Sequence, residues 1–500
     1  MKIGIIGGGI SGLSLGCFLQ IRGYDTEIFE SHSVAGGLCS SWRKGDFIFD
    51  GCLHWVLGSD SGSSFYKLWS ELLDMRSIEF VNHDIRVAIE LKDNTDKNGN
   101  KVFLLYTNID KLETYLLEIA PEDRAVIRSF VKLIRVMQKY ELPPMIDNIP
   151  RLQTLRDKMD MIKYLPFVFQ FFRWKNETNF SFAKKLKNPF LKEAFELLFD
   201  GDEVNLMVMA MPLAFYDKKS AGYPVGGSAS FARRIADKYE DLGGKIHFNT
   251  QVDKILVENN IAKGVLLCDG TSLFSDITVS AADWHFTVFN ALEGKFVNRK
   301  ILELAKLKKF EVFPSVMLVS LGVSRDFKEH QHFFRFPIEQ DYTSPDGTLY
   351  NRVEAHIYHY DPSLAPEGKT VIAMSFYTKN GEFWINLRNS NREEYNKSKA
   401  LFAETMVDFL DQKIGGVKDS IEEIDVSTPA TYQRYTGNWK GSVQGWFPGK
   451  NLLASSPVSA TLPGLKNFYY TSHWSIPGGG LPSALKSAHD LAQIISLAHT

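Results

Sequence analysis

The first thirty residues alternate between apolar strand patterns and one helical pattern. An apolar run covers 3–6, apolar residues recur at helical spacing from Leu13 to Leu19, and a second strand pattern covers 25–29. Glycines at positions 7, 8, 9 and 12 occupy the turn between the first strand and the helix. The pattern predicts a strand, a tight turn, a helix and a second, parallel strand.

The glycine spacing in this turn is that of a dinucleotide-binding motif, in the context that the motif requires. Gly7 allows the tight turn, Gly9 lets the backbone approach a pyrophosphate, and Gly12 permits close packing of the helix on the strand. Ser11 lies in the same turn, at a helix N-terminus that faces the phosphate charge. Glu30 follows the second strand, where it accepts hydrogen bonds from ribose hydroxyls and repels a 2′-phosphate.

Two further blocks also combine glycines with a following helix. The first, 222–228 (GYPVGGS), precedes a helical pattern over 229–242. Short strand patterns then cover 245–248, 252–257, 262–268 and 277–280. An Asp269-Gly270 turn among them predicts a small sheet with a hairpin. In the second block a strand leads into Gly478-Gly479-Gly480, and apolar positions from Leu481 to Ile495 predict an amphipathic helix.

A glycine pair, Gly36-Gly37, follows Glu30 and can lie against a cofactor. Together with the other blocks, the pair resembles FAD-dependent enzymes of the phytoene desaturase and carotenoid isomerase family, within the amine-oxidase-like flavoproteins. The resemblance implies FAD as the cofactor. Members of that family usually carry an arginine after the glycine pair, where this chain has Leu38, and Arg43 is the candidate to replace it.

The resemblance also implies positions around the cofactor. The Val252 backbone would lie against the adenine, and Gly226 and Gly227 would lie near the flavin or substrate, unless they only form a helix N-terminal turn. The C-terminal glycine loop would lie beside the isoalloxazine, where the helix end stabilises negative charge. The expected cofactor-binding residues are Gly7, Gly9, Ser11, Gly12, Glu30, Gly36, Gly37, Leu38, Arg43, Gly226, Gly227, Val252, Gly478, Gly479, Gly480 and Leu481.

The predicted fold class is α/β, with a discontinuous Rossmann-type FAD-binding domain and a mixed α+β substrate-binding domain. Residues 1–75, 220–290 and 450–500 are expected to form the FAD-binding domain. Residues 76–219 and 291–449 are expected to form the substrate-binding domain and to define the substrate.

Composition narrows the class of partner. The chain has 500 residues, with 57 Lys+Arg against 59 Asp+Glu and a net charge of -2, which argues against a nucleic-acid partner. Its four cysteines include no CxxC pair, so no metal site is expected and a reducing compartment, the cytoplasm, is favoured. The longest apolar stretches, 204–216 and 312–323, fall short of the roughly 18 residues that span a bilayer, and the N-terminus lacks a signal-peptide pattern.

The segment 161–175 (MIKYLPFVFQFFRWK) mixes aromatic residues with cations. This composition suits a peripheral contact with an anionic membrane surface. An ordinary helix that buries its phenylalanines in the core, or a lid over a substrate tunnel, would have the same pattern.

Two histidines are candidates for handling a proton. His54 closely follows the glycine-pair segment, and His473 adjoins the C-terminal glycine loop. The remaining candidates, His330, His332, His356 and His359, are expected to be surface groups without a catalytic role.

The predicted function is that of an FAD-dependent oxidoreductase that desaturates, or saturates, a long apolar polyene or isoprenoid-like lipid; the family resemblance supplies the substrate class. No second dinucleotide motif is present, so electrons would pass to a diffusible acceptor such as a quinone or oxygen. Three alternatives remain: a redox-neutral double-bond isomerase that uses reduced FAD, a flavin amine oxidase, and a non-catalytic flavin-containing lipid carrier.

Overall fold

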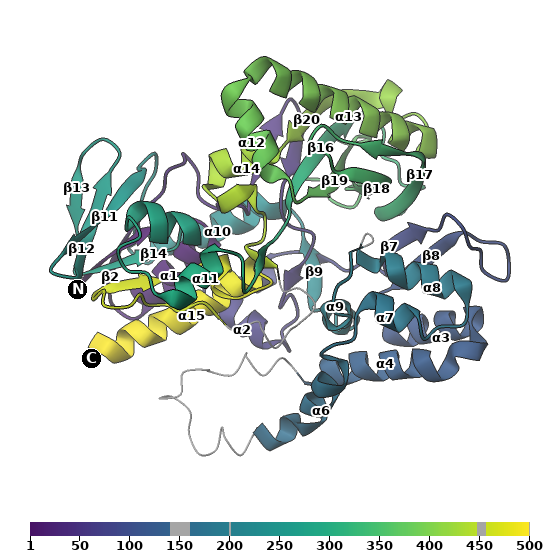
Figure 1. Cartoon of the computed structure of the whole chain (residues 1–500), viewed down its shortest axis with the longest axis horizontal. Coiled ribbons are helices and arrows are strands. Elements are labelled where there is room, and N and C mark those ends of the chain that lie inside the picture. Colours follow the sequence, from purple (N-terminus) through teal and green to yellow (C-terminus); the bar gives the residue numbers. More distant parts are fainter. Residues whose placement is uncertain (141–160, 200–201, 448–456, 500) are drawn as a thin grey trace.

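The computed structural model describes residues 1–140, 161–199, 202–447 and 457–499 (Figure 1). They form a five-stranded sheet, a seven-stranded sheet and smaller sheets, with a layer of helices beside β7 and β8. Both chain termini lie at the end of the molecule that contains the five-stranded sheet (Figure 1).

The five-stranded sheet is parallel throughout. Its strands in spatial order are β10 (Lys245–His247), β2 (Asp25–Phe29), β1 (Lys2–Ile6), β14 (Ile277–Ser280) and β22 (Phe468–Tyr470). β1 is buried from Ile3 to Ile6, which explains why it is continuously apolar rather than alternating. The strands come from three distant parts of the sequence, and the predicted α/β class with a Rossmann-type unit is confirmed.

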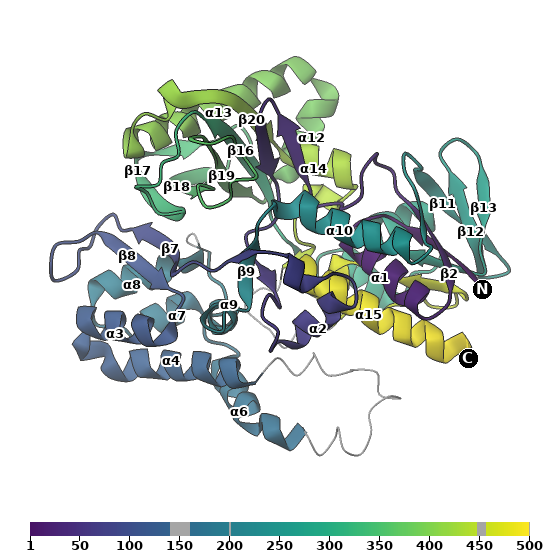
Figure 2. The same cartoon turned by 180° about the vertical axis from the view of Figure 1, so that it is seen from behind.

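Three helices form the layer on one face of this sheet (Figure 2). α1 (Ile10–Ile21) packs between α10 (Gly227–Asp241) and α15 (Gly480–His499), as the helical patterns predict. The contact of α1 with α10 is close, because a Cβ on Gly16 would lie 2.6 Å from the Tyr239 ring. α2 (Ser64–Ser70) contacts α15.

The opposite face carries an antiparallel sheet and an aromatic core. The sheet contains β11 (Val252–Glu258), β12 (Ile261–Leu267) and β13 (Ser272–Phe274). The predicted Asp269-Gly270 turn joins β12 to β13. The aromatic core contains three tryptophans that contact one another, Trp284, Trp446 and Trp474. A π-helical segment (Phe286–Ala291) and α11 (Arg299–Ala305) contribute to the same core.

The seven-stranded sheet forms the second large layer. Its order is β20 (Ile421–Ser427), β16 (Ser315–Val323), β19 (Thr370–Thr378), β18 (Leu349–Ile357), β17 (Phe333–Thr343), β7 (Ile85–Glu90) and β8 (Val102–Tyr106). Only the β17–β7 pair among these described strands is parallel. The helices around it are α12 (Gly381–Ser390), α13 (Arg392–Ile414) and α14 (Pro429–Thr436).

The helical layer beside β7 and β8 has its own core, built largely from phenylalanines. Its helices are α3 (Ile109–Ile119), α4 (Arg124–Lys139), α6 (Leu165–Trp174), α7 (Asn179–Ala183), α8 (Pro189–Glu196) and α9 (Met207–Asp217). Phe130, Phe182 and Phe195 contact one another inside it. None of the helices in the described ranges is both long and apolar enough to cross a bilayer.

Short strands connect these layers. β3 (Ser41–Lys44) pairs with β4 (Phe47–Asp50), and β15 (Glu311–Val312) pairs with β21 (Trp446–Phe447). β9 (Ala221–Pro224) lies between β5 (Val56–Leu57) and β6 (Phe80–Val81). These pairs bring the chain around residues 50–57 between the parallel sheet and the seven-stranded sheet. The domain boundaries expected from the sequence stay a prediction.

Candidate functional site

A cavity of about 240 Å³ lies where the predicted glycine turns converge. The predicted site residues that line it are Gly7, Gly9, Ser11, Glu30, Gly36, Gly37, Leu38, Val252, His473, Gly480 and Leu481. They come from the β1–α1 turn, the segment after β2, the start of β11, the turn His473–Ser475 and the start of α15. The tertiary structure therefore brings most of the predicted cofactor residues together.

The β1–α1 turn presents backbone to this cavity. A Cβ on Gly12 would lie 2.0 Å from the Gly7 carbonyl oxygen, so close packing of α1 on the turn requires glycine there. A Cβ on Gly9 would meet only atoms at 3.9 Å, so that position is open. Gly9 caps α1 without a side-chain hydrogen bond, which leaves first-turn N–H groups for an anion. This cradle fits a pyrophosphate.

The Glu30 carboxylate is fixed at the cavity wall. Its Oε2 accepts a hydrogen bond from the Gly8 N–H at 2.7 Å, and its Oε1 accepts one from the His32 N–H at 2.8 Å. Oε1 also accepts from the Ser31 hydroxyl at 3.2 Å, so the second lone pair of Oε2 is the one that can accept from a ribose hydroxyl. The negative charge in this place opposes a second phosphate at the ribose.

The glycine pair lies against the β1–α1 turn. The Gly36 N–H donates to the Gly8 carbonyl at 2.9 Å, and Gly9 and Gly36 form a parallel β-bridge. Gly36 has φ +127°, and a Cβ there would lie 2.5 Å from the Cys39 carbonyl oxygen. The pair is therefore needed for a tight loop that lines the cavity, with Leu38 beside it.

The C-terminal glycine loop is divided between two tasks. Gly480 and Leu481 line the cavity at the first turn of α15, whose positive end faces it. Gly479 instead allows the loop to pack against the backbone of Gln444, because a Cβ at this position would lie 1.7 Å from the Gln444 carbonyl oxygen. Gln444 Nε2 also donates to the Gly478 carbonyl at 2.7 Å, which fixes the loop.

His473 lines the same cavity, just before this loop. Its Nε2 is buried without a hydrogen-bond partner, and burial lowers the pKa of the imidazole to about 4. The ring is therefore neutral at pH 7. Ser472 caps the turn that holds it by accepting from the Trp474 N–H at 3.0 Å.

Arg43, Gly226 and Gly227 lie away from the described lining of this cavity. Arg43 is exposed on β3. The Gly226 N–H donates to Asp361 at 3.0 Å, and a Cβ on Gly227 would lie 2.2 Å from an Asp50 carboxylate oxygen. The two glycines thus form the N-terminal turn of α10, as the alternative interpretation of this block has it.

The cavity wall contains an acid that the sequence does not single out. Asp283 follows β14, and it accepts from the Phe286 N–H at 2.8 Å and the Trp439 N–H at 2.9 Å. Burial raises the pKa of its carboxyl to about 6. Its position after a strand of the parallel sheet could have indicated it as a site residue, because ligands of such sheets bind at the carboxyl ends of the strands.

His54 lies in a second, smaller cavity of about 20 Å³, which we name the histidine-lined cavity. Its described lining is His54, Val81, His83, Arg86, Thr107, Tyr216, Ala221, Tyr223, His332, His356 and Tyr360. The rings of His54 and His356 stack with centroids 4.3 Å apart, and those of His83 and His332 with centroids 3.5 Å apart. Cys52, two residues before His54, lines the cofactor cavity.

The prediction that His332 and His356 are surface groups is wrong. They are 9% and 3% exposed. β7 and β17 are neighbours in the sheet, and Phe333, next to His332, pairs with His356 of β18. The polar residues before His332 suggested a solvated stretch, but the sheet encloses its side chain.

The histidines of this cavity are held neutral. Burial is the main cause, and the nearby Arg86 charge adds to it, so the pKa of His54 and of His356 lies below the usual range. The same causes lower the pKa of His83 to about 4. Despite the four imidazoles, no group of side chains within the described parts of the chain could hold a metal ion.

Comparison with known proteins gives consistent results. The sequence model of the flavin-containing amine oxidoreductases matches residues 10–496. A prolycopene isomerase of Daucus carota is 24% identical over 99% of this chain and 80% of its own length. A 4,4′-diapophytoene desaturase of Methylomonas sp. is 23% identical over 99% of this chain and 95% of its own length. A solved oxidoreductase from Methanosarcina mazei superposes with a TM-score of 0.62 and 18% identity, over 99% of this chain and 100% of the other.

Proposed function

Since the chain belongs to the family of flavin-containing amine oxidoreductases, we propose that it moves a hydride between FAD and a long apolar polyene or isoprenoid-like lipid. Family membership confirms the predicted resemblance, the FAD cofactor and the oxidoreductase class. The substrate class is supported by two polyene-modifying relatives that match nearly the whole chain. The observation that carries the proposal is the convergence of the glycine turns, Glu30 and His473 on one cavity.

When bound, FAD supplies a two-electron centre that accepts or donates a hydride. The β1–α1 turn and Glu30 would hold its diphosphate and ribose, and the first turn of α15 would favour negative charge in the cavity. His473 offers a neutral imidazole with an unpartnered Nε2, which can accept a proton or donate one from that atom.

Electron balance separates the possible reactions. Desaturation removes two hydrogens and passes the electrons to a diffusible acceptor such as a quinone or oxygen, because the chain has no second dinucleotide motif. Saturation adds two hydrogens. Isomerisation leaves the mass unchanged and needs only reduced flavin, and the similarity to a prolycopene isomerase supports it as the second candidate.

The test is anaerobic incubation of the FAD-loaded protein with phytoene, prolycopene and an alkylamine, followed by flavin absorbance and mass spectrometry. Flavin bleaching with a polyene product two hydrogens lighter supports desaturation. A product of unchanged mass, formed only after dithionite reduction, supports isomerisation, and a heavier product supports saturation. Bleaching by the amine alone would replace the lipid proposal by amine oxidation, and a flavin inert toward every compound would leave only the carrier.

The helix α6 supports contact with a membrane surface. Leu165, Phe169 and Phe172 of α6, together with Ile162 in the preceding 3-10 turn, are 58–66% exposed and follow one another at helical spacing. Phe167 and Trp174 of α6 are buried. Lys175 Nζ lies 5.1 Å from the Phe172 ring centroid, so a cation borders the apolar face. An anionic bilayer matches this combination, and it would also be the source of an apolar substrate.

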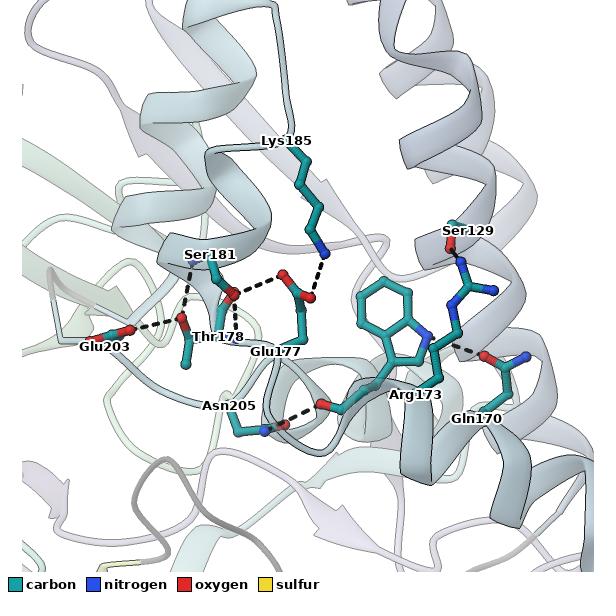
Figure 3. Close-up of polar contacts among 10 residues, drawn as sticks. Ser129, Gln170, Arg173, Glu177, Thr178, Ser181, Lys185, Glu203 and Asn205 are labelled. Atoms are coloured by element: carbon teal, nitrogen blue, oxygen red, sulfur yellow. Dashed lines mark hydrogen bonds and ion pairs between the residues drawn. The ribbon is translucent and has the colours of Figure 1, made fainter.

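Polar contacts hold the C-terminal end of α6 against the helical layer (Figure 3). Arg173 donates to the Ser129 hydroxyl of α4 at 3.0 Å, and Asn205 Nδ2 donates to the Lys175 carbonyl at 2.7 Å. Glu177 accepts from the Ser181 hydroxyl at 2.7 Å, next to this connection. These contacts orient the exposed face of α6 relative to its core.

Co-sedimentation with vesicles tests the membrane contact. Binding should rise with the anionic lipid fraction and fall with salt, because salt screens the cationic contribution. The double variant Phe169→Ser/Phe172→Ser should lose binding with little change in melting temperature. The control Phe167→Ser should instead lose about 3 kcal/mol of stability, as a buried phenylalanine does. Equal binding by wild type and the double variant would refute the contact.

A further inference from the structure

The histidine-lined cavity contains a guanidinium without a counter-ion. Arg86 of β7 lines it, with Cζ 4.9 Å from the Phe333 ring centroid and 5.6 Å from the Tyr216 ring centroid. None of the described lining residues is acidic, and Arg86 forms no ion pair or hydrogen bond with another residue that the structure describes. A cation withdrawn from water is costly unless an anion or acceptors compensate it.

The nearby buried carboxylate, that of Glu354, is already paired with another cation. Glu354 pairs with Arg335, whose Nη2 lies 2.6 Å from Oε2, and its other oxygen lies 3.7 Å from His356 Nε2. This ion pair satisfies the charge of Glu354. Arg86 therefore contributes an uncompensated positive charge to the cavity.

Two imidazole atoms at this cavity are also without partners. His54 Nδ1 and His83 Nε2 are buried and make no hydrogen bond. A neutral imidazole can donate at one nitrogen and accept at the other, so both rings can complete a polar site. The space of about 20 Å³ is that of about one water molecule, so it can take a single carboxylate oxygen but not a lipid segment.

We propose that the histidine-lined cavity receives the carboxylate end of a lipid substrate, with Arg86 as its counter-ion and His54 and His83 as hydrogen-bonding partners. This inference rests on the proposed lipid oxidoreductase and narrows its substrate to a polyene that carries an acid group. Cys52 lines the cofactor cavity and His54 the histidine-lined cavity, so the acid end would lie one short chain segment away from the flavin. Arg86 is then a residue that determines specificity.

Other end groups match the cavity less well. A hydrocarbon end would leave the guanidinium and both imidazole atoms without partners. An alcohol or ester supplies oxygen but no negative charge, so it forgoes the charge-assisted hydrogen bond. A small free carboxylate has the same chemistry as the lipid acid, and the experiment must separate the two.

The first measurement needs only the FAD-loaded wild type. Parinaric acid, a fluorescent conjugated polyene acid, and its methyl ester are titrated anaerobically at pH 8, where the acid is ionised. The acid should bind about 10- to 100-fold more tightly than the ester, the ratio expected for a charge-assisted hydrogen bond. Acetate in large excess should displace little of the acid, because it lacks the apolar chain. Equal affinity of acid and ester would overturn the proposal. Displacement of parinaric acid by an equal concentration of acetate would also overturn it and would assign the cavity to a small free anion.

The second measurement compares variants of equal size. Arg86→Met should remove the preference for the acid and leave ester affinity unchanged, and Arg86→Lys should retain part of the preference. Arg233→Met, at an exposed site on α10, is the matched control and should behave like wild type. Melting temperature and flavin absorbance report folding of each variant. A preference that survives in folded Arg86→Met would overturn the role of Arg86, and if that variant does not fold, the Arg86→Lys titration decides.

The two proposals can fail separately. Binding of the acid and ester is measured without turnover, whereas the oxidoreductase is tested by flavin bleaching with hydrocarbon polyenes. If phytoene bleaches the flavin but the protein shows no preference for the acid, the oxidoreductase proposal stands and the acid site is refuted. If the protein prefers the acid but no lipid changes the flavin absorbance, the acid-binding site stands and the oxidoreductase proposal is refuted.

Discussion

Cys52 lines the cofactor cavity and His54 lines the histidine-lined cavity, yet the two cavities are built in opposite ways. Backbone of glycine-rich turns lines much of the first, and its important contacts are N–H groups and close approaches such as that of Gly12 to Gly7. The second is lined by imidazole, phenol and guanidinium side chains on separate segments.

This difference has a physical consequence. The glycine turns of the cofactor cavity are sensitive to added volume and do not titrate, so pH acts on that cavity only through side chains such as His473 and Asp283. A site of buried imidazoles is sensitive to pH, because each ring must stay neutral to remain buried.

Acid should destabilise the protein mainly through the buried histidines. The pKa of His83 and of His473 is lowered to about 4, and burial also lowers the pKa of His54, His332 and His356. The unfolded chain therefore takes up protons below about pH 6.5 while the folded chain does not, so stability falls from there toward pH 4. His83 and His473 alone should cost roughly 4 kcal/mol between pH 7 and pH 5.

Urea unfolding at the two pH values measures this loss. The variant His83→Gln should lose less stability between pH 7 and pH 5 than wild type, since one titrating group is gone. Equal losses of stability in wild type and His83→Gln would show that His83 is not held neutral in the folded protein.

Added volume in the β1–α1 turn should destabilise the backbone site. Gly12→Ala places a Cβ 2.0 Å from the Gly7 carbonyl oxygen and should cost about 3 kcal/mol of stability or more. Gly9→Ala has space for its Cβ, so it should keep the stability of the FAD-free protein and weaken FAD binding. Thermal melting and FAD titration of both variants distinguish packing from phosphate approach. Equal losses of stability at the two positions would show that Gly9 is needed for packing in the same way as Gly12.

Removing the Glu30 charge should have the smallest of these effects. Glu30→Ala should weaken FAD binding by about 1.5 to 3 kcal/mol, because charge-assisted bonds to the ribose are lost. Glu30→Gln keeps an oxygen acceptor and should lose less. Equilibrium dialysis with FAD measures both, and unchanged retention in Glu30→Ala would remove this residue from the site.

The success of the sequence predictions follows the same division. Gly7, Gly9 and Gly36 were predictable because a turn that needs glycine is encoded by neighbours in the chain. Gly226 and Gly227 were ambiguous, since the same glycines that approach a ligand also begin a helix beside Asp50. Asp283 was missed because a single acid after a strand carries no local pattern.

The Rossmann-type unit and the FAD cofactor could be predicted from the sequence, because strand period, helix period and glycine turns are properties of short contiguous segments. The grouping of His54, His83, His332 and His356 in one cavity with Arg86 is visible only in the folded chain. Strand alternation indicates which side chains share a face, but it does not indicate which distant segment covers that face. The pairing of β7 with β17 and β17 with β18 supplied that information, and with it the burial that keeps the imidazoles neutral.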